Sequence, residues 1–517
     1  MNAELTRWTG PEGLPRFDLI ADTDIAPAFD RELAAAEAAM EAIAANPEAP
    51  TFANTVAALE TAEDGLNRVL SIFYTLANVD SNPAREALQR DFAPRLAAYN
   101  SKTGMDPRLY ARVKAVAATA DTLPPEDRRI TELALRGLTR SGAGLEGEAR
   151  DRMAAIRARM AVLTTHFSQN VLADERNYVL PVPDDRLAGL PDWLVRSMRA
   201  AAKARGMDGQ VVTLSRSLIV PFLEHAGDRA LREVAFRAWA ARGSGDGAGG
   251  KATDNLPLVT EILALRHERA RLLGYADFAA YKLEPEMAGT ADRVAELLAQ
   301  VWEPARNRAA EDEARLTAMA HQDGVNGAME AWDWRLYAER LRRQDHDFDA
   351  DQVKPYLTLD AMLGAMMDVV HRLFRLEFQP FDAPLWSADA RAWRITRDGR
   401  LMAIFVGDYF ARPSKRSGAW CSSMQVQHKI GPGQRPIVVN VCNFTPPEEP
   451  GAPAFLSWDD ARTLFHEFGH ATHHILSDVT WPSISGTAVA QDFVELPSQL
   501  YEHWLEQPAV LDAHARH

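Results

Sequence analysis

The sequence predicts a mainly α-helical protein that contains one small β-sheet. Over most of its 517 residues, apolar side chains recur every three or four positions, as in RELAAAEAAMEAIAANP from Arg31 onward. This is the period of an amphipathic helix. The pattern changes between Trp393 and Phe444, where the β-rich runs AWRIT, LMAIFVGDYF and PIVVNVCNF are separated by turn residues such as Asp398-Gly399. Helical spacing returns after Ser457, so we expect the sheet to lie inside a helical protein.

Composition and charge exclude several classes of protein. The formal net charge is −15, from 57 basic and 72 acidic residues, which disfavours binding to nucleic acid or to an anionic membrane surface. The two cysteines, Cys421 and Cys442, are too few for a disulfide framework. The N-terminus lacks the pattern of a signal peptide, and no window approaches about 18 uninterrupted apolar residues. These observations predict a cytoplasmic protein.

The helical segments divide the chain into three predicted parts. Residues 1–240 are expected to form an N-terminal helical lobe, with helix breaks such as Asn46-Pro47. Residues 241–255 are rich in glycine and contain no large apolar residue, which predicts a flexible loop or a junction between lobes. Residues 256–517 are expected to form a second helical lobe that holds the sheet at about 393–444.

The segment SWDDARTLFHEFGHATHHIL contains an HExxH sequence that begins at His466. Ser457 and Asp460 have the spacing of a capping box, which predicts that the motif lies about two turns inside a helix. At about 100° per residue, His466 and His470 lie roughly 40° apart around the helix axis, so both imidazoles can reach one cation. Glu467 then lies beside the metal, as a general base and not as a ligand.

A catalytic zinc ion needs a third protein ligand, and the downstream segment SGTAVAQDFVELPSQLYEHW offers Asp492 and Glu495. We select Glu495, which follows His466 by 29 residues (495 − 466) on a second predicted helix. Asp492, one turn earlier on the same face, is then expected to orient a ligand imidazole. His473 and His474 also fall on the metal-facing side of the first helix, either as alternative ligands or as packing residues.

These motifs resemble those of the thimet-oligopeptidase-like zinc metallopeptidases and, within that family, of the bacterial peptidyl-dipeptidases. The resemblance extends over the whole chain and rests on the segments FHEFGHATHHIL, SGTAVAQDFVELPSQLYEHW, GDYFARPSKRSGAWC and VNVCNF. It implies that His466, His470 and Glu495 are the zinc ligands and that Glu467 is the general base.

The resemblance also implies an architecture. A protein of this family is expected to be an elongated, two-lobed helical body with a deep substrate channel and a small sheet beside the HExxH helix. Its extended substrate pairs with an edge strand, and Gly418-Ala419-Trp420 is the segment most similar to that strand. The family continues well beyond the position of His517, through a helical segment that supplies tyrosines and a histidine for catalysis. We therefore expect this chain to be truncated at its C-terminal end.

Together, the motifs and the resemblance predict an enzyme that binds one Zn²⁺ per chain and hydrolyses short unfolded peptides as a monomer. The segments WDWRLYAERLRR and VNVCNF favour release of C-terminal dipeptides over internal cleavage by an oligopeptidase. Two other classes stay open at this point. One is a truncated chain that binds zinc or peptides without hydrolysis. The other is a helical scaffold with an accidental HExxH sequence, for which chance would also have to supply Glu495.

Overall fold

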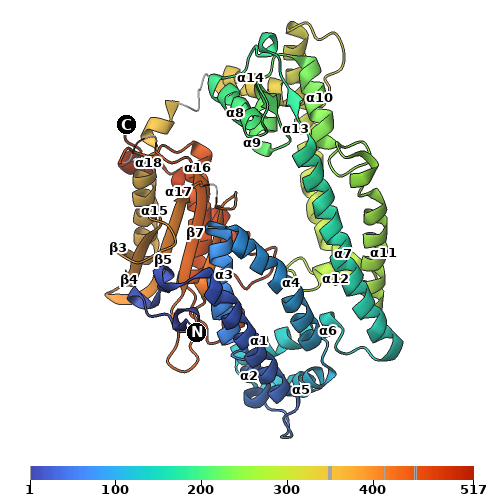
Figure 1. Ribbon diagram of the computed structural model, residues 1–517, viewed down its shortest axis with the longest axis vertical. Coiled ribbons are helices and arrows are strands. Elements are labelled where there is room, and N and C mark those ends of the chain that lie inside the picture. Colours follow the sequence, from blue (N-terminus) through green and yellow to red (C-terminus); the bar gives the residue numbers. More distant parts are fainter. Residues whose placement is uncertain (1, 347–351, 413, 448, 450) are drawn as a thin grey trace. The chain divides into compact units, whose positions relative to one another are not determined.

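The computed structural model describes residues 2–346, 352–412, 414–447, 449 and 451–517 (Figure 1). It is mainly helical, with a five-stranded mixed sheet and a further pair of short strands. This confirms the predicted fold class. No helix among the described residues combines the length and the apolar character needed to cross a membrane.

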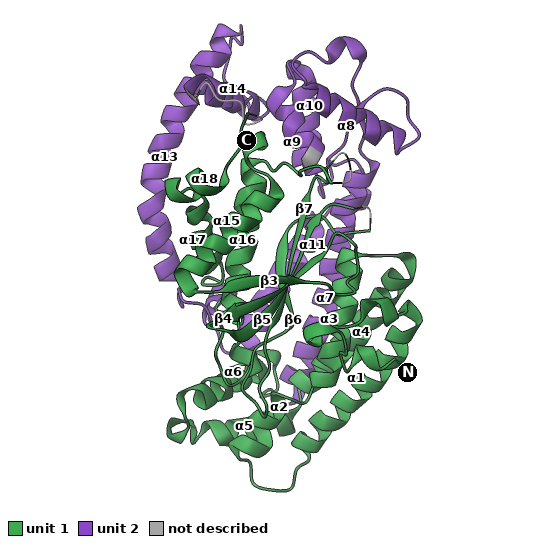
Figure 2. Ribbon diagram, turned by 90° about the vertical axis from the view of Figure 1, so that its left-hand side faces the viewer, with its two compact units in different colours: residues 1–146, 350–517 green, residues 147–349 purple. Residues whose placement is uncertain are grey.

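The chain forms two compact units (Figure 2). Unit 1 contains residues 1–146 and 350–517, and unit 2 contains residues 147–349. These boundaries differ from those of the predicted lobes, 1–240 and 256–517, and the predicted glycine-rich loop lies inside unit 2. The difference arises because the first helices bury their apolar side chains against the sheet, whose strands come from the C-terminal part of the chain.

The N-terminal part of unit 1 is a series of helices. They are α1 (Asp22–Ala44), α2 (Ala57–Leu59), α3 (Asp64–Val79), α4 (Pro83–Gly104), α5 (Pro107–Ala117) and α6 (Pro125–Ser141). Local sequence sets their ends. Asn82 caps α4 by accepting a hydrogen bond from the Arg85 amide at 2.9 Å, and Pro83 occupies the first helical position, where no intrahelical donor is needed. Gly142, with φ of 95°, ends α6 in the left-handed conformation that glycine adopts without strain.

Five strands form the mixed sheet of unit 1. They are β3 (Glu377–Phe381), β4 (Arg391–Arg397), β5 (Arg400–Phe410), β6 (Trp420–Gln425) and β7 (Ile437–Phe444), in the order β3-β4-β5-β7-β6. β5 and β7 are parallel, and the other neighbouring pairs are antiparallel. Asp398 and Gly399 have φ of 52° and 76° and form the turn between β4 and β5, as the Asp-Gly pair predicts. The sheet also contains β3, which the sequence did not predict because Pro380 interrupts it, and an edge strand tolerates that proline.

The sheet separates two hydrophobic cores of unit 1. On one face, Val438 of β7 packs in a cluster with Phe468 of α16 (Trp458–Ile475). On the other face, Val439 packs in a cluster with Phe73 of α3. Because successive strand residues point to opposite faces, β7 contributes alternate side chains to the two cores.

The C-terminal part of unit 1 contains α15 (Leu359–Phe374), α16, α17 (Glu495–Leu505) and α18 (Pro508–His514). The predicted capping box at the start of α16 is present. The Asp460 amide donates to Ser457 Oγ at 3.0 Å, and the Ser457 amide donates to Asp460 Oδ2 at 3.0 Å. The HExxH sequence therefore lies about two turns inside α16.

Unit 2 is helical, with one pair of short strands. Its elements are α7 (Gly147–Asn177), β1 (Leu180–Pro181), α8 (Asp192–Lys203), β2 (Val211–Val212), α9 (Arg216–His225), α10 (Arg229–Ala240), α11 (Leu256–Leu272), α12 (Phe278–Leu283), α13 (Ala291–Gln322) and α14 (Trp334–His346). The loop at 241–255 joins α10 to α11 and winds around the buried carboxylate of Asp174. That carboxylate accepts hydrogen bonds at 2.7 Å from Gly243 N, Gly249 N and Thr253 Oγ1.

Candidate metal centre

Three side chains from two helices converge at the candidate metal centre. His466 and His470 lie one turn apart on α16, and Glu495 is the first residue of α17. Glu495 Oε2 is 3.3 Å from His466 Nε2 and 3.2 Å from His470 Nε2. Among the described residues, these three form the group whose potential ligand atoms all lie within 4.8 Å of one another.

The geometry of this group fits a zinc ion. Zinc binds imidazole nitrogen and carboxylate oxygen at about 2.0–2.2 Å in a tetrahedral arrangement, so its ligand atoms lie about 3.3–3.5 Å from each other. The measured distances of 3.3 and 3.2 Å from Glu495 Oε2 to the two imidazoles agree with that spacing. Two histidines and one carboxylate also form a donor set used by catalytic zinc sites, which keep one position open.

Close packing of α16 on α17 brings Glu495 to the histidines. Gly469, inside the HExxH sequence, lies against α17, and a Cβ at this position would be 2.6 Å from Ser498 Cα and 3.0 Å from Pro497 O. Ser498 Oγ donates to Glu495 Oε2 at 2.8 Å, which holds the carboxylate toward the site. Pro497 lies in the first turn of α17, where a missing amide donor leaves no helical hydrogen bond unmade.

Glu467 lies beside this group and is mostly buried, with 6% of its surface exposed. The pKa of Glu467 is raised to about 7, with burial as the largest cause. The neighbouring Glu495 carboxylate acts in the same direction, and His466 opposes the change. The Glu467 carboxylate accepts a hydrogen bond from the backbone amide of Cys421 in β6. Glu467 therefore lies between the metal centre and the edge strand of the sheet.

Glu502 is a residue of the site that sequence reasoning missed. Its Oε1 lies 2.6 Å from His466 Nδ1, the ring nitrogen that faces away from Glu495, and its other oxygen lies 3.7 Å from Arg462 Nε. Glu502 follows Glu495 by seven residues on α17, so the two carboxylates lie on one face of that helix, and this spacing was the available signal. Asp492, to which the sequence assigned the orienting role, precedes α17, and its contribution stays a prediction.

The two further histidines of α16 have other surroundings. The His473 ring lies 6.3 Å from the Phe493 ring, edge to face, and burial lowers the pKa of His473. His474 Nε2 lies within hydrogen-bond distance of Thr487 Oγ1, at 3.2 Å, and burial lowers the pKa of His474 to about 4. Neither belongs to the group of converging ligand atoms found among the described residues.

The predicted substrate-binding residues lie at the start of the edge strand. Trp420 is the first residue of β6, and Gly418 precedes it with φ of 98°. The carbonyl oxygen of Gly418 accepts a hydrogen bond from Asn443 Nδ2 at 2.6 Å, which fixes the approach to β6. Ala419 lies between them and packs partly buried against the core that contains α16. Their contact with a substrate stays a prediction.

A buried glutamate beside two histidines and a carboxylate, within an HExxH helix, is a site of the metallopeptidase type. Comparison with known proteins identifies the family: the chain belongs to peptidase family M3, whose model matches residues 222–517. The predicted family is therefore confirmed, and the protein is a peptidase.

Characterised relatives resemble the chain over nearly its whole length. The dipeptidyl carboxypeptidase of Escherichia coli (strain K12) is 34% identical over 525 residues, which cover 100% of this chain and 76% of the relative. The dipeptidyl carboxypeptidase of Salmonella typhimurium is 35% identical, covering 98% of this chain and 75% of the relative. Oligopeptidase A of Escherichia coli (strain K12) is 30% identical, covering 97% of this chain and 75% of the relative. The chain thus spans about three quarters of the length of these relatives.

Proposed function

We propose that the protein is a zinc peptidase that releases dipeptides from the C-terminus of short unfolded peptides. The observation that carries this proposal is the convergence of His466, His470 and Glu495 next to the buried Glu467. The higher identity to the two dipeptidyl carboxypeptidases, 34% and 35% against 30% for oligopeptidase A, supports dipeptide release. Action as a monomer in the cytoplasm is part of the same proposal.

The side chains of the site have distinct tasks in this reaction. His466, His470 and Glu495 would hold the metal. A zinc ion bound there would supply Lewis acidity to the scissile carbonyl and to a water molecule, whose pKa it would lower toward 7. Glu467 accepts the proton of that water as the general base and then delivers it to the nitrogen of the leaving amine. The buried position of Glu467 keeps bulk water from competing for the proton.

Internal cleavage is the second candidate function, because oligopeptidase A is also a relative over nearly the whole chain. The products separate the candidates. The purified chain is loaded with zinc and incubated with an N-blocked oligopeptide, and the products are identified by mass spectrometry. Sequential loss of C-terminal dipeptides is the expected result. Internal fragments would support oligopeptidase action, and bound zinc without cleavage would support a binding protein.

Replacement of the general base tests the mechanism. In Glu467→Gln, zinc content is expected to stay at one ion per chain while turnover falls by at least about 100-fold, because glutamine cannot accept the proton. Metal analysis and the peptide assay measure the two quantities on one sample. Near-normal turnover in this variant would remove Glu467 from the mechanism.

Replacement of the third ligand tests the metal centre. In Glu495→Ala, zinc is expected to bind much more weakly, with the helical circular dichroism spectrum unchanged, because two imidazoles alone do not complete the site. Glu506→Ala, an exposed glutamate just after α17, is the matched control and is expected to keep its zinc. Unchanged zinc content in Glu495→Ala would point to a different third ligand.

A further inference from the structure

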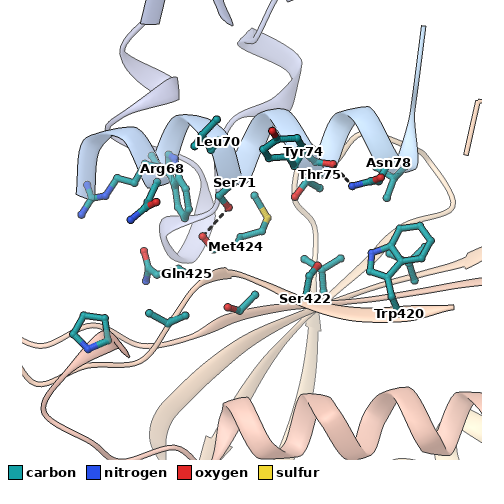
Figure 3. Close-up of a pocket in the computed structure, with 18 of the residues that line it drawn as sticks. Arg68, Leu70, Ser71, Tyr74, Thr75, Asn78, Trp420, Ser422, Met424 and Gln425 are labelled. Atoms are coloured by element: carbon teal, nitrogen blue, oxygen red, sulfur yellow. Dashed lines mark hydrogen bonds between the residues drawn. The ribbon is translucent and has the colours of Figure 1, made fainter. Parts of the chain in front are cut away.

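A cavity lies beside β6, on the face of the sheet that α3 covers (Figure 3). Its volume is about 670 Å³, which falls in the range of about 300–1,000 Å³ that is usual for ligand pockets. Trp420 and Ser422 point from the strand toward the helix, while Tyr74 and Thr75 come from α3. All the residues that line the cavity belong to unit 1.

The cavity and the metal centre share this strand. The backbone amide of Cys421 donates a hydrogen bond to Glu467, whereas Trp420 and Ser422, on either side of Cys421, face the cavity. β6 pairs with β7 and ends the sheet, and no other strand of the described chain pairs with its second edge. That edge therefore runs directly past the general base and can accept an extended peptide as an additional strand.

Part of the open edge is already occupied, which limits where a peptide can add. Ser71 Oγ of α3 donates to the carbonyl oxygen of Met424 at 2.8 Å, and this contact ties the end of β6 to the helix (Figure 3). The stretch from Trp420 to Ser423 lies before that contact. This is also the stretch that lies next to Glu467 through Cys421.

Strand geometry connects this edge to the cavity. Side chains of an extended peptide alternate between the two faces of the sheet that it joins. A residue that points toward the metal centre is therefore flanked by residues that point toward α3. Building on the proposed function, we propose that the cavity between α3 and β6 is a substrate subsite that receives one of these flanking side chains and selects an aromatic residue.

The lining indicates an aromatic occupant. Trp420 and Tyr74 offer ring surfaces, against which an aromatic side chain packs edge to face or offset. Two of the charged residues have other contacts: Arg68 Nη1 donates to the Thr6 carbonyl oxygen at 3.1 Å, and the Arg416 guanidinium lies 5.8 Å from the centre of the Trp420 ring. Asp64 lies one turn before Arg68 on α3, and the two charges attract each other. Ring contact and not charge is therefore the main attraction that the cavity offers.

The test measures binding and does not depend on cleavage. Zinc-loaded protein that carries Glu467→Gln is titrated calorimetrically with an alanine-rich hexapeptide and with versions that carry one phenylalanine at each position in turn. Phenylalanine is expected to tighten binding by about tenfold at alternate positions, as burial of one large side chain requires. Adding Thr75→Phe, which fills the cavity from α3, is expected to abolish that gain.

Two controls make the test specific. Thr122→Phe places the same ring at an exposed position outside the cavity and is expected to keep the gain. In protein with Thr75 intact, a p-benzoylphenylalanine peptide is expected to form photo-crosslinks within residues 71–78 or 420–425. The proposal would be overturned if phenylalanine still tightened binding in the Thr75→Phe variant, or if it tightened binding equally at every peptide position. Crosslinks found only outside residues 71–78 and 420–425 would also overturn it. Because wild-type cleavage is assayed separately, loss of hydrolysis with this binding pattern intact would contradict the proposed function alone.

Discussion

Glu502 sets the orientation of the imidazole of His466, one of the three proposed ligands. Its Oε1 lies 2.6 Å from His466 Nδ1, so the carboxylate accepts a hydrogen bond from that ring nitrogen. The proton is then held on Nδ1, and Nε2, which faces Glu495 at 3.3 Å, has its lone pair free for a metal. A hydrogen bond on the far side of the ring thus leaves His466 in the tautomer that its proposed role as a ligand requires.

Loss of this carboxylate is expected to weaken metal binding without removing a ligand. In Glu502→Gln, the zinc dissociation constant is expected to rise by about 10–100-fold, the usual effect of removing such a hydrogen-bond partner. Competition with a chromogenic chelator measures it. Glu506→Gln, on an exposed glutamate four residues further along the chain, is the matched control. Equal zinc affinity in the two variants would show that Glu502 does not orient His466.

At the scale of secondary-structure elements, the contact between α16 and α17 decides whether the three candidate ligands meet. Gly469 makes this contact possible, because a Cβ at its position would lie 2.6 Å from Ser498 Cα, which is backbone and cannot move alone. Glu495 begins α17 only three residues before Ser498. Any shift of α17 away from α16 therefore also moves the carboxylate away from His466 and His470.

Gly469→Ala is expected to destabilise the protein although alanine favours helices. Overpacking costs about 1–3 kcal/mol, which exceeds the gain of about 1 kcal/mol in helix propensity. Zinc affinity is expected to fall in the same variant, and urea unfolding and chelator competition measure the two effects. Gly364→Ala in α15 is the control, because its Cβ would meet only His514 Nδ1, at 3.7 Å, so its stability is expected to stay equal or rise. Equal changes in unfolding free energy and zinc affinity in the two variants would show that the close approach at Gly469 affects neither stability nor metal binding.

For the whole molecule, each compact unit contains a fully buried aspartate held by cations. In unit 1, Asp408 bonds Arg412 at 2.6 Å and Lys415 at 2.9 Å. In unit 2, Asp333 bonds Arg229 and Arg232 at 2.7 and 2.8 Å.

Burial acts to raise the pKa of each aspartate, but the hydrogen bonds from its partners outweigh burial and lower the pKa. A carboxyl whose folded pKa is lowered stabilises the fold above its unfolded pKa of about 3.9, and that contribution is lost as pH falls through the folded pKa.

Replacing either aspartate is expected to destabilise only the unit that contains it. Asp408→Asn and Asp333→Asn each leave a buried cation without its carboxylate, at an expected cost of about 3–5 kcal/mol. Hydrogen exchange at pH 7 is expected to show lost protection in residues 1–146 and 350–517 for Asp408→Asn, and in residues 147–349 for Asp333→Asn. Each variant is also expected to lose less stability than the wild type on acidification below about pH 4, because its titrating group is gone. Equal loss of protection in both units would mean that the units do not unfold separately.

The sequence by itself determined the helical class, the main strands and the HExxH pair. These features depend on the spacing of residues within one element, such as the one-turn separation of His466 and His470. The selection of Glu495 over Asp492, which has the same chemistry and lies one turn earlier, was a hypothesis from the residues, and the resemblance implied the same ligand.

Only the tertiary structure decided which distant segments meet. It brought Glu502 to His466, built one core from the first helices and the late strands, and placed α3 beside β6, where Ser71 bonds Met424 across 353 residues of chain. The physical reason is that such contacts depend on how whole faces of elements pack, and the local pattern of apolar residues defines a face without defining its partner.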